Sequence, residues 1–490
     1  MEDQKIPEKI FSPTSVLTLG HARVEITPPI GIYHRMWGAA RHDQATGVHR
    51  PMYADLLILE NSEGQERVVR LQLDLVLLSN VQTDAIAQSV ANVADVCRER
   101  VLVTYSHSHA AGFFLPDRIP LSGGELIEPY LDSLRTNVEQ LTREASENMQ
   151  SVIVMYAYGR CDVAANRDYR DEARGIFVTG YNPHEDADDT VISARVSDAQ
   201  GNHLLSVVHY ACHPTTLAWD NSLLSPDFVG AMREVVQRET NVPCVFFQGA
   251  CGDLGPKDGF TGDTDVADRN GRQLGFAALS ALASLGPSGT DFTYSGPVKS
   301  GATIGTWEWS PFDAQRMADT MRWEGRFCTV DLPFRTLPTA NELQSDLSHY
   351  SQAQKKADEV GDLQAARDAG ALAERCRRWL ARLVDLPEGK MFPYRYSVFQ
   401  FGDAVWITCS AEPYNALIRE LRDRFPKLVI LLSPIAGDSM LAYLLPKDRY
   451  GLGLYQEEPS CLGPGCLEKL TDDMAKVIEN ITGNVSITSK

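Results

Sequence analysis

Segments with the two-residue period of strands alternate with segments of helical period over the first 290 residues, and this alternation most constrains the fold. The stretches 16–32 and 54–79 have strand character, the second around the polar turn "NSEGQE", whereas 80–97 and 123–149 repeat apolar residues at helical spacing. This order predicts an α/β fold with mixed sheets flanked by helices rather than an all-β sandwich.

A charged segment over residues 340–385 predicts two helices that break near Gly361. Its charges are typical of a solvated face, and an insertion or a dimer contact is the functional alternative. The chain has no repeat, low-complexity tract or Pro/Ser linker. We therefore expect a single catalytic domain over residues 16–482 that carries this helical insertion, with tails at 1–15 and 483–490.

Charge and cysteine content exclude several classes of protein. A formal net charge of −19 argues against nucleic acid as a partner and against tight docking on anionic membranes. The N-terminus has no signal-peptide pattern, and no apolar run is long enough for a transmembrane helix, so we expect no stable membrane insertion. Ten scattered cysteines suit a reducing, cytoplasmic location, and Cys461 and Cys466 are expected to be free or loosely paired.

Polar residues capable of metal binding or catalysis follow several predicted strands. His107 and His109 stand one residue apart after an apolar run, so a continued strand would point both to the same side. His213, Glu412 and Tyr443 follow other strands. Two or three histidines with one carboxylate form a common zinc set, but a histidine at a strand end is also often a hydrogen-bonded structural residue.

Other polar residues have structural and functional interpretations. Asp253, in the glycine-rich loop "QGACGDLGP", either steers the attacking water or closes the turn. His209 either approaches the metal or is buried and hydrogen-bonded, and we expect the second. Asp74 lies in an apolar strand, so we expect it to be hydrogen-bonded to loop amides or to a histidine beside the metal site. Ser225 is the predicted N-cap of the helix over 225–240.

Eight segments occur in the order found in the neutral ceramidase family (neutral/alkaline, non-lysosomal), which the chain resembles over residues 16–480. They are "GHARVEITPPIG", "TGVHRPMYADLLIL", "YSHSHAAG", "NRDY", "HPTTL", "FFQGACGDLGP", "AEPYN" and "AYLLPKDRYGLGLYQEE". The resemblance implies a neutral-ceramidase-like catalytic domain that hydrolyses an amide (N-acyl) bond with zinc as cofactor.

The resemblance also implies roles for individual residues. The zinc ligands would be His107, His213, Glu412 and Tyr443. The residues that contact substrate or intermediate would be His109, Arg167 and, by a less certain alignment, Tyr455. The proton acceptor would be Asp253 or His109.

Two departures from the family affect the expected substrate. Gly255 stands where neutral ceramidases carry a catalytic serine, so no serine hydroxyl acts from this position. Thr215 and Ser225 are nearby hydroxyls, although no spacing nominates them. We also expect no counterpart of the immunoglobulin-like domain that follows the catalytic region in ceramidases.

Three functions follow from these observations. The first is a zinc-dependent hydrolase, acting on an amide of a small or lipid-like acyl substrate by metal-activated water. The second is a zinc esterase, lactonase or short N-acyl amide hydrolase with a small soluble substrate. The third is a non-catalytic homologue that binds a ligand. A homo-oligomer is compatible with all three.

Overall fold

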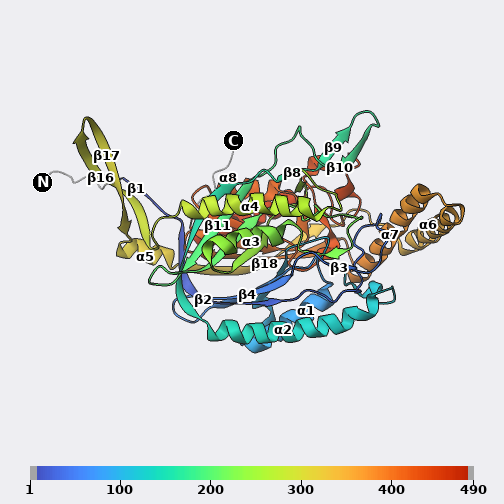
Figure 1. Cartoon of the computed structure of the whole chain (residues 1–490), viewed down its shortest axis with the longest axis horizontal. Helices are drawn as coiled ribbons and strands as arrows, with labels where there is room; N and C mark the ends of the chain where they lie inside the picture. The colour runs from blue at the N-terminus through green and yellow to red at the C-terminus, as the bar shows by residue number, and fades with distance from the viewer. Residues whose placement is uncertain (1–7, 484–490) are drawn as a thin grey trace.

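The chain is described by a computed structural model that covers residues 8–483. Two β-sheets stack face to face at its centre, and helices cover the outer face of each sheet (Figure 1). This architecture confirms the predicted α/β class with mixed sheets flanked by helices.

The larger sheet contains eight strands. In spatial order they are β14 (Cys244–Gln248), β12 (His203–Tyr210), β11 (Thr190–Ser197), β7 (Gln150–Arg160), β2 (Thr14–Glu25), β4 (Tyr53–Glu60), β5 (Arg67–Leu73) and β6 (Val101–Tyr105). Neighbours are antiparallel except for the parallel pairs β14–β12 and β5–β6. Because twist of about 20–25° per strand accumulates across a sheet, the two edges turn towards each other, and the edge strands β14 and β6 are in contact.

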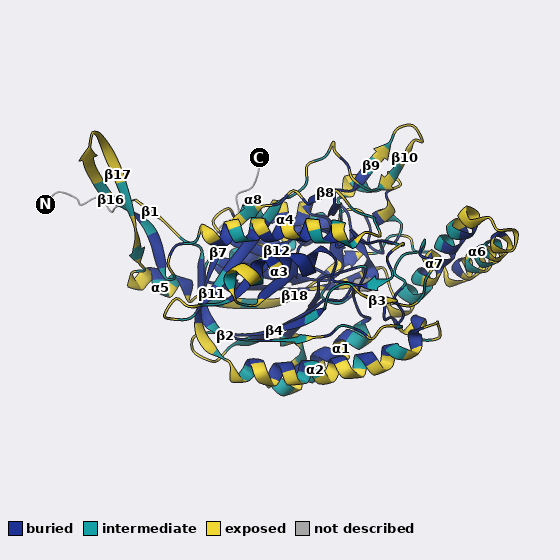
Figure 2. Cartoon of the chain, in the orientation of Figure 1, coloured by how far each residue is buried: buried dark blue, intermediate teal, exposed yellow. Residues whose placement is uncertain are grey.

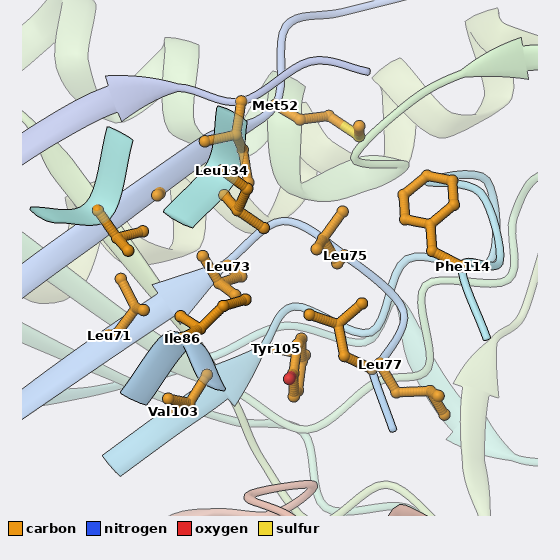
Figure 3. Close-up of a cluster of buried hydrophobic side chains, with 14 of the residues drawn as sticks. Met52, Leu71, Leu73, Leu75, Leu77, Ile86, Val103, Tyr105, Phe114 and Leu134 are labelled. Atoms are coloured by element: carbon orange, nitrogen blue, oxygen red, sulfur yellow. The ribbon is translucent and has the colours of Figure 1, made fainter. Parts of the chain in front are cut away.

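Four helices pack on the outer face of this sheet: α1 (Asn80–Ala94), α2 (Ile127–Glu147), α3 (Phe228–Thr240) and α4 (Thr264–Ala283). Figure 3 shows part of the core that they enclose, where Leu71 and Leu73 of β5 and Val103 of β6 lie with Ile86 of α1 and Leu134 of α2. Full burial of each such side chain contributes about 1.5–3 kcal/mol. This core fixes the positions of β5 and β6.

The smaller sheet has four strands, β18 (Trp323–Pro333), β19 (Met391–Phe401), β20 (Ala404–Cys409) and β22 (Val429–Ser433). Helices α8 (Ala416–Arg424) and α9 (Cys466–Thr482) cover its outer face. On the inner face, Phe399, Phe401 and Trp406 pack among apolar residues of the larger sheet. The two sheets therefore share one core.

The predicted helical insertion consists of α6 (Ala340–Val360) and α7 (Leu363–Asp385), which project together from the body (Figure 1). Gly361 ends α6 with a φ of 74°, a conformation that glycine adopts without strain. The break near Gly361 is thus confirmed. The interpretation of the charges as a solvated face is wrong for part of α7, because Glu374 is buried against the body.

A hairpin at the opposite end of the molecule was not expected from the sequence. Strands β16 (Thr290–Ser300) and β17 (Ala302–Pro311) extend away from the sheets, and β1 (Lys9–Ile10) pairs with β16 (Figure 1). Figure 2 shows that the hairpin is largely exposed while the central strands are buried.

The predicted tails are only partly described. The N-terminal tail predicted over residues 1–15 extends too far, because Lys9–Ile10 form a strand and Thr14 begins β2. Residues 1–7 lie outside the described part. At the other end Gly483 caps α9, and 484–490 are likewise not described.

Short elements complete the fold and carry several site residues. They are β3 (Gly47–Val48), β8 (Ala164–Asn166), β9 (Asp168–Asp171), β10 (Ile176–Thr179), β13 (Leu223–Leu224), β15 (Leu254–Pro256), α5 (Ala314–Thr320), β21 (Glu412–Pro413) and β23 (Tyr443–Leu444). No helix within residues 8–483 combines the length and apolarity needed to cross a bilayer.

Three local expectations have clear outcomes. The N-cap of α3 is Asp227, which accepts a hydrogen bond from the Phe228 amide, so the prediction of Ser225 is wrong. Asp74 is paired, but its main partner is not a histidine: its carboxylate accepts two hydrogen bonds from Arg233 at 2.8 and 3.1 Å and one from the Tyr53 amide at 2.9 Å. Cys461 and Cys466 are both free, as expected.

Candidate functional site

Most of the predicted site residues converge at one end of the sheets, on a cavity of about 890 Å³. The predicted residues that line it are His107, His109, Arg167, Glu412, Tyr443 and Tyr455. His213 lies directly behind them, with its ring centroid 4.9 Å from that of His107. The accumulated sheet twist explains why residues that follow β6 and β12 meet here, although five strands separate these two strands in the sheet.

His107 and His213 are held in the same way, each by a backbone carbonyl. His107 Nδ1 donates to the Val76 carbonyl at 2.7 Å, and His213 Nδ1 donates to the Cys251 carbonyl at 2.7 Å. Because a carbonyl oxygen only accepts, Nδ1 carries the proton in both rings. In the neutral form of each ring Nε2 therefore presents a lone pair, the arrangement typical of histidines that bind a metal.

Glu412 reaches the same point from the smaller sheet, just after β20. Its Oε2 lies 3.0 Å from His213 Nε2 and 3.5 Å from His107 Nε2. Ligand atoms about 2.0–2.2 Å from a tetrahedral zinc ion are about 3.3 Å apart, so these separations suit such an ion.

The electrostatics of this group favour a cation. Burial lowers the pKa of His213 to about 4, with Arg167 contributing. Burial acts to raise the pKa of Glu412, but the charges and hydrogen bonds of His107 and His213 outweigh it and leave that pKa well below its ordinary value. The Glu412 carboxylate and the two Nε2 atoms thus meet at one point, and the charge of the carboxylate favours a cation there.

The backbone is strained where these residues are placed. His107 itself has a φ of 67°, and Ala411 and Ala442, which precede Glu412 and Tyr443, have φ values of 60° and 58°. Left-handed conformations in non-glycine residues are uncommon and cluster at functional sites. The Glu412 amide donates to the Ala442 carbonyl at 2.8 Å, which ties the two strained segments together.

His109 lies beside the pair but is held differently. Its Nε2 is 3.4 Å from His107 Nε2, and the metal-binding atoms of the three histidines lie within 4.8 Å of one another. Within the described residues, no backbone carbonyl accepts from its Nδ1. Burial lowers the pKa of His109 well below its ordinary value, so the ring is neutral at neutral pH.

His107 and His109 face the same point, as expected, but not because a strand continues through them. Strand β6 ends at Tyr105, before either residue. The turn at His107, not the alternation of a strand, brings the rings together, with centroids 4.9 Å apart.

Arg167 and Tyr443 form the next part of the wall. The Arg167 guanidinium donates to the Gly252 carbonyl at 2.8 Å and lies 5.5 Å from the Tyr443 ring centroid. Burial raises the pKa of Tyr443 well above its ordinary value, and Glu412 adds to the effect. Tyr455, whose ring centroid is 6.0 Å from that of Tyr443, is 51% exposed and lies at the cavity mouth.

Asp253 does not join the group. It is not part of the cavity lining, and its Oδ1 accepts from the Asn415 amide at 2.6 Å, next to the start of α8. Burial raises its pKa to about 6. Its contacts match the structural interpretation, a carboxylate that holds the glycine-rich loop against α8. His209 is likewise structural, with its Nε2 donating to the Leu432 carbonyl at 2.8 Å.

Gly255 has space for a side chain. A Cβ there would contact Arg167 Cδ at 3.6 Å and Thr215 Oγ1 at 3.8 Å, both ordinary distances. Thr215 lines the cavity, whereas the Ser225 hydroxyl is bonded to His49 and to the Asp227 amide.

Sequence reasoning missed two parts of the cavity wall. One is an aromatic group around His109: the Trp37 ring lies 5.3 Å from it and also contacts Trp219 and Phe260. Single aromatic residues in loops gave no signal. The other is one face of α7. The arginines of "RCRRWLAR" recur at helical spacing, and this pattern could have indicated a charged helix face.

No protein-family model matches the chain. Its fold is similar to that of a crystal structure of neutral ceramidase from Pseudomonas aeruginosa, at 16% sequence identity and a TM-score of 0.65, over 98% of this chain and 76% of that one. A structure of a ceramidase complexed with C2 is similar at 15% identity and a TM-score of 0.62, over 98% of this chain and 77% of that one. The chain therefore has a ceramidase-like fold.

Proposed function

We propose that the protein is a zinc-dependent hydrolase that cleaves an amide (N-acyl) bond. The observation that carries this proposal is the convergence of lone pairs from His107, His213 and Glu412 on one point beside a large cavity. The fold similarity to proteins named as ceramidases supports an amide as the scissile bond.

The residues present fit a zinc site with three protein ligands and one further position. His107 and His213 would bind through Nε2 and Glu412 through Oε2, with Tyr443 as the candidate fourth ligand. Zinc, when bound, lowers the pKa of water and polarises a carbonyl group, which is hydrolytic chemistry. The hydrogen bonds from Nδ1 to Val76 and Cys251 would keep both rings oriented.

The neighbouring residues have roles that follow from their charge. Arg167 carries a fixed positive charge at the cavity wall, suited to stabilising negative charge that develops on a carbonyl oxygen. A neutral His109 has one ring nitrogen that can accept a proton and one N–H that can donate to that oxygen. Asp253 is the weaker candidate for proton transfer because it contacts α8 and not the cavity.

Metal content is the first test. Protein purified without an affinity metal is analysed by plasma mass spectrometry as wild type, His107→Ala, His213→Ala and the exposed control His349→Ala. We expect one zinc per chain in wild type and control and none in the two site variants. Wild type that binds no metal even after reconstitution with zinc contradicts the proposal.

Substrate class is tested with amides and esters graded by acyl length, from acetyl derivatives to ceramides. The cavity is near the upper end of the usual range for small-molecule sites, about 300–1,000 Å³, so we expect turnover to rise with acyl length. Preference for short esters or lactones supports the esterase alternative. Binding without turnover across the panel supports the non-catalytic alternative.

A further inference from the structure

One face of α7 forms a wall of the cavity that also holds the candidate metal centre. Ala371, Arg375, Arg378 and Arg382 lie about one helical turn apart and all line the cavity. Arg378 pairs with Glu374 at 2.9 Å, and Arg375 pairs with Glu458 at 3.4 Å. The insertion thus places a row of guanidinium groups along the wall.

Arg382 has no anionic partner. Its guanidinium lies 5.4 Å from the Trp379 ring centroid, and its Nε is buried without a hydrogen-bond partner. Across residues 8–483, no carboxylate pairs with it and no carbonyl accepts from it. The Nη atoms of Arg382 are not among the buried unpaired atoms, so this side of the guanidinium is open to a partner in the cavity.

Apart from Arg167 beside the candidate metal centre, Arg335 is the second arginine of the lining that lacks a carboxylate partner in the described chain. Its Nη1 donates to the Glu457 carbonyl, and its amide donates to the Cys461 carbonyl at 3.0 Å. Trp379, which the Arg382 guanidinium overlies, donates to Glu458 Oε1 at 3.0 Å. The two arginines therefore meet the adjacent residues Glu457 and Glu458 on one side of the cavity that both line.

The acidic residues of the lining are engaged elsewhere. Asp117 and Glu374 pair with Arg118, and Glu458 pairs with Arg375. Glu457, the remaining carboxylate on this side, accepts from the Gly451 amide at 3.0 Å. In a chain with a net charge of −19, two cavity arginines without a carboxylate partner, in addition to Arg167 at the candidate metal centre, require an explanation.

We propose that Arg335 and Arg382 form a subsite for a carboxylate carried by the substrate, in addition to the bond that is cleaved. This proposal rests on the proposed function and names its substrate class: an N-acyl compound with a second, anionic end. Planar guanidinium groups match the two oxygens of a carboxylate. Glu457 and Glu458, which line the same cavity, favour a singly charged group over a dianion.

The test uses coumarin amides of straight-chain acids in matched pairs. One member is the mono-amide of a dicarboxylic acid, from succinoyl to sebacoyl, and the other ends in a neutral carboxamide. We expect wild type to prefer the carboxylate member at one chain length. Arg382→Gln and Arg335→Gln should each lower kcat/KM for that member about 10- to 100-fold, the usual effect of a charged hydrogen bond, and lower it far less for the neutral member.

Control variants separate this effect from general damage to α7. Arg377→Gln removes a charge from the same helix at a position outside the cavity lining, where Arg377 pairs with Glu374 at 3.6 Å. It should leave the preference intact. Arg382→Lys keeps the charge and loses the planar geometry, so an intermediate preference is expected even if Arg382→Gln folds poorly. If Arg382→Gln lowers kcat/KM equally for the carboxylate and the carboxamide member of a pair, the proposed subsite is wrong.

A binding measurement separates failure of the subsite from failure of the proposed function. Calorimetry compares suberate with octanoate, using wild type and Arg382→Gln. Tighter binding of suberate that disappears in Arg382→Gln, in a protein that hydrolyses no amide, supports the subsite and contradicts the hydrolase. Hydrolysis with no dependence on the carboxylate or on either arginine supports the hydrolase and contradicts the subsite.

Discussion

Two glycines on either side of Asp253 meet very different surroundings. A Cβ on Gly252 would lie 2.7 Å from the Glu412 carbonyl oxygen and 3.0 Å from Pro413 backbone atoms, closer than real Cβ atoms pack. A Cβ on Gly255 would meet nothing closer than 3.6 Å. The backbone of the loop thus contacts the backbone of Glu412 directly, and Gly252 permits this approach.

Alanine substitutions at these glycines should have opposite effects. Gly252→Ala should lower the free energy of unfolding by about 1–3 kcal/mol through overpacking and weaken zinc binding by displacing Glu412. Gly255→Ala should be neutral or stabilise by up to about 1 kcal/mol, because it restricts the unfolded chain. Chemical denaturation and zinc titration of both variants check this. A Gly252→Ala protein with unchanged zinc affinity would contradict the argument.

His109 should differ from the other two histidines when removed. Its Nδ1 lacks the carbonyl partner that orients His107 and His213 in the described structure, so we expect it to act on the substrate and not as a ligand. His109→Ala should retain one zinc per chain and lose about 10²- to 10⁴-fold in turnover, the usual contribution of acid–base catalysis. Zinc loss equal to that in His107→Ala would make His109 a ligand.

At the scale of elements, the helical insertion is attached by a buried ion-pair group. Arg118 donates to Glu374 at 2.7 and 3.0 Å, and Arg378 donates to the same carboxylate at 2.9 Å. Burial acts to raise the pKa of Glu374, but Arg378 and Arg118 outweigh it and lower that pKa to about 2. This group holds the cavity face of α7 against the body.

The attachment of α7 should weaken in acid. Because the folded pKa lies below the ordinary value of 4.5, the stabilisation is complete above pH 4.5 and is lost as the pH falls towards 2. Glu374→Gln should destabilise the protein by about 3 kcal/mol at neutral pH and by less as the pH falls. Denaturation at several pH values measures this difference, with Asp368→Asn on the exposed face of α7 as control. If the difference in free energy of unfolding between wild type and Glu374→Gln does not change with pH, the ionised Glu374 carboxylate does not hold α7.

The sequence predicted where helices and strands lie along the chain better than it predicted which of them pack together. Periodicity located α1, α2 and α3 and the break at Gly361, because local spacing determines those features. The same spacing does not show that Arg118, more than 200 residues earlier in the chain, neutralises Glu374. The hairpin β16–β17 was missed because its contacts with the sheets are few and its apolar residues are largely exposed.

The candidate site shows the same limit. The identities of His107, His213 and Glu412 followed from strand ends and from the resemblance. Their convergence depends on the twist of the larger sheet and on left-handed turns at non-glycine residues, which sequence patterns do not signal. The placement of Asp253 against α8 depends on tertiary packing alone.

At the scale of the whole molecule, the candidate metal centre joins the two stacked sheets. His107 and His213 follow strands of the larger sheet, whereas Glu412 follows β20 of the smaller one. Phe399, Phe401 and Trp406 already join the sheets through a shared core. An ion held by all three ligands would add a second connection at the end of the sheets where the cavity opens.

Zinc should therefore stabilise the entire fold and not one element. At a free zinc concentration about 100-fold above Kd, binding adds about 2.7 kcal/mol. Unfolding entropy of about 2.1 cal/mol/K per residue makes this a rise in Tm of about 3 °C for a chain of 490 residues. Calorimetry before and after chelation measures the shift, which should be reversed by added zinc and be absent in His213→Ala. His349→Ala should keep it. If zinc raises the Tm of His213→Ala equally, the stabilising ion lies elsewhere, and the two sheets are joined by their apolar core alone.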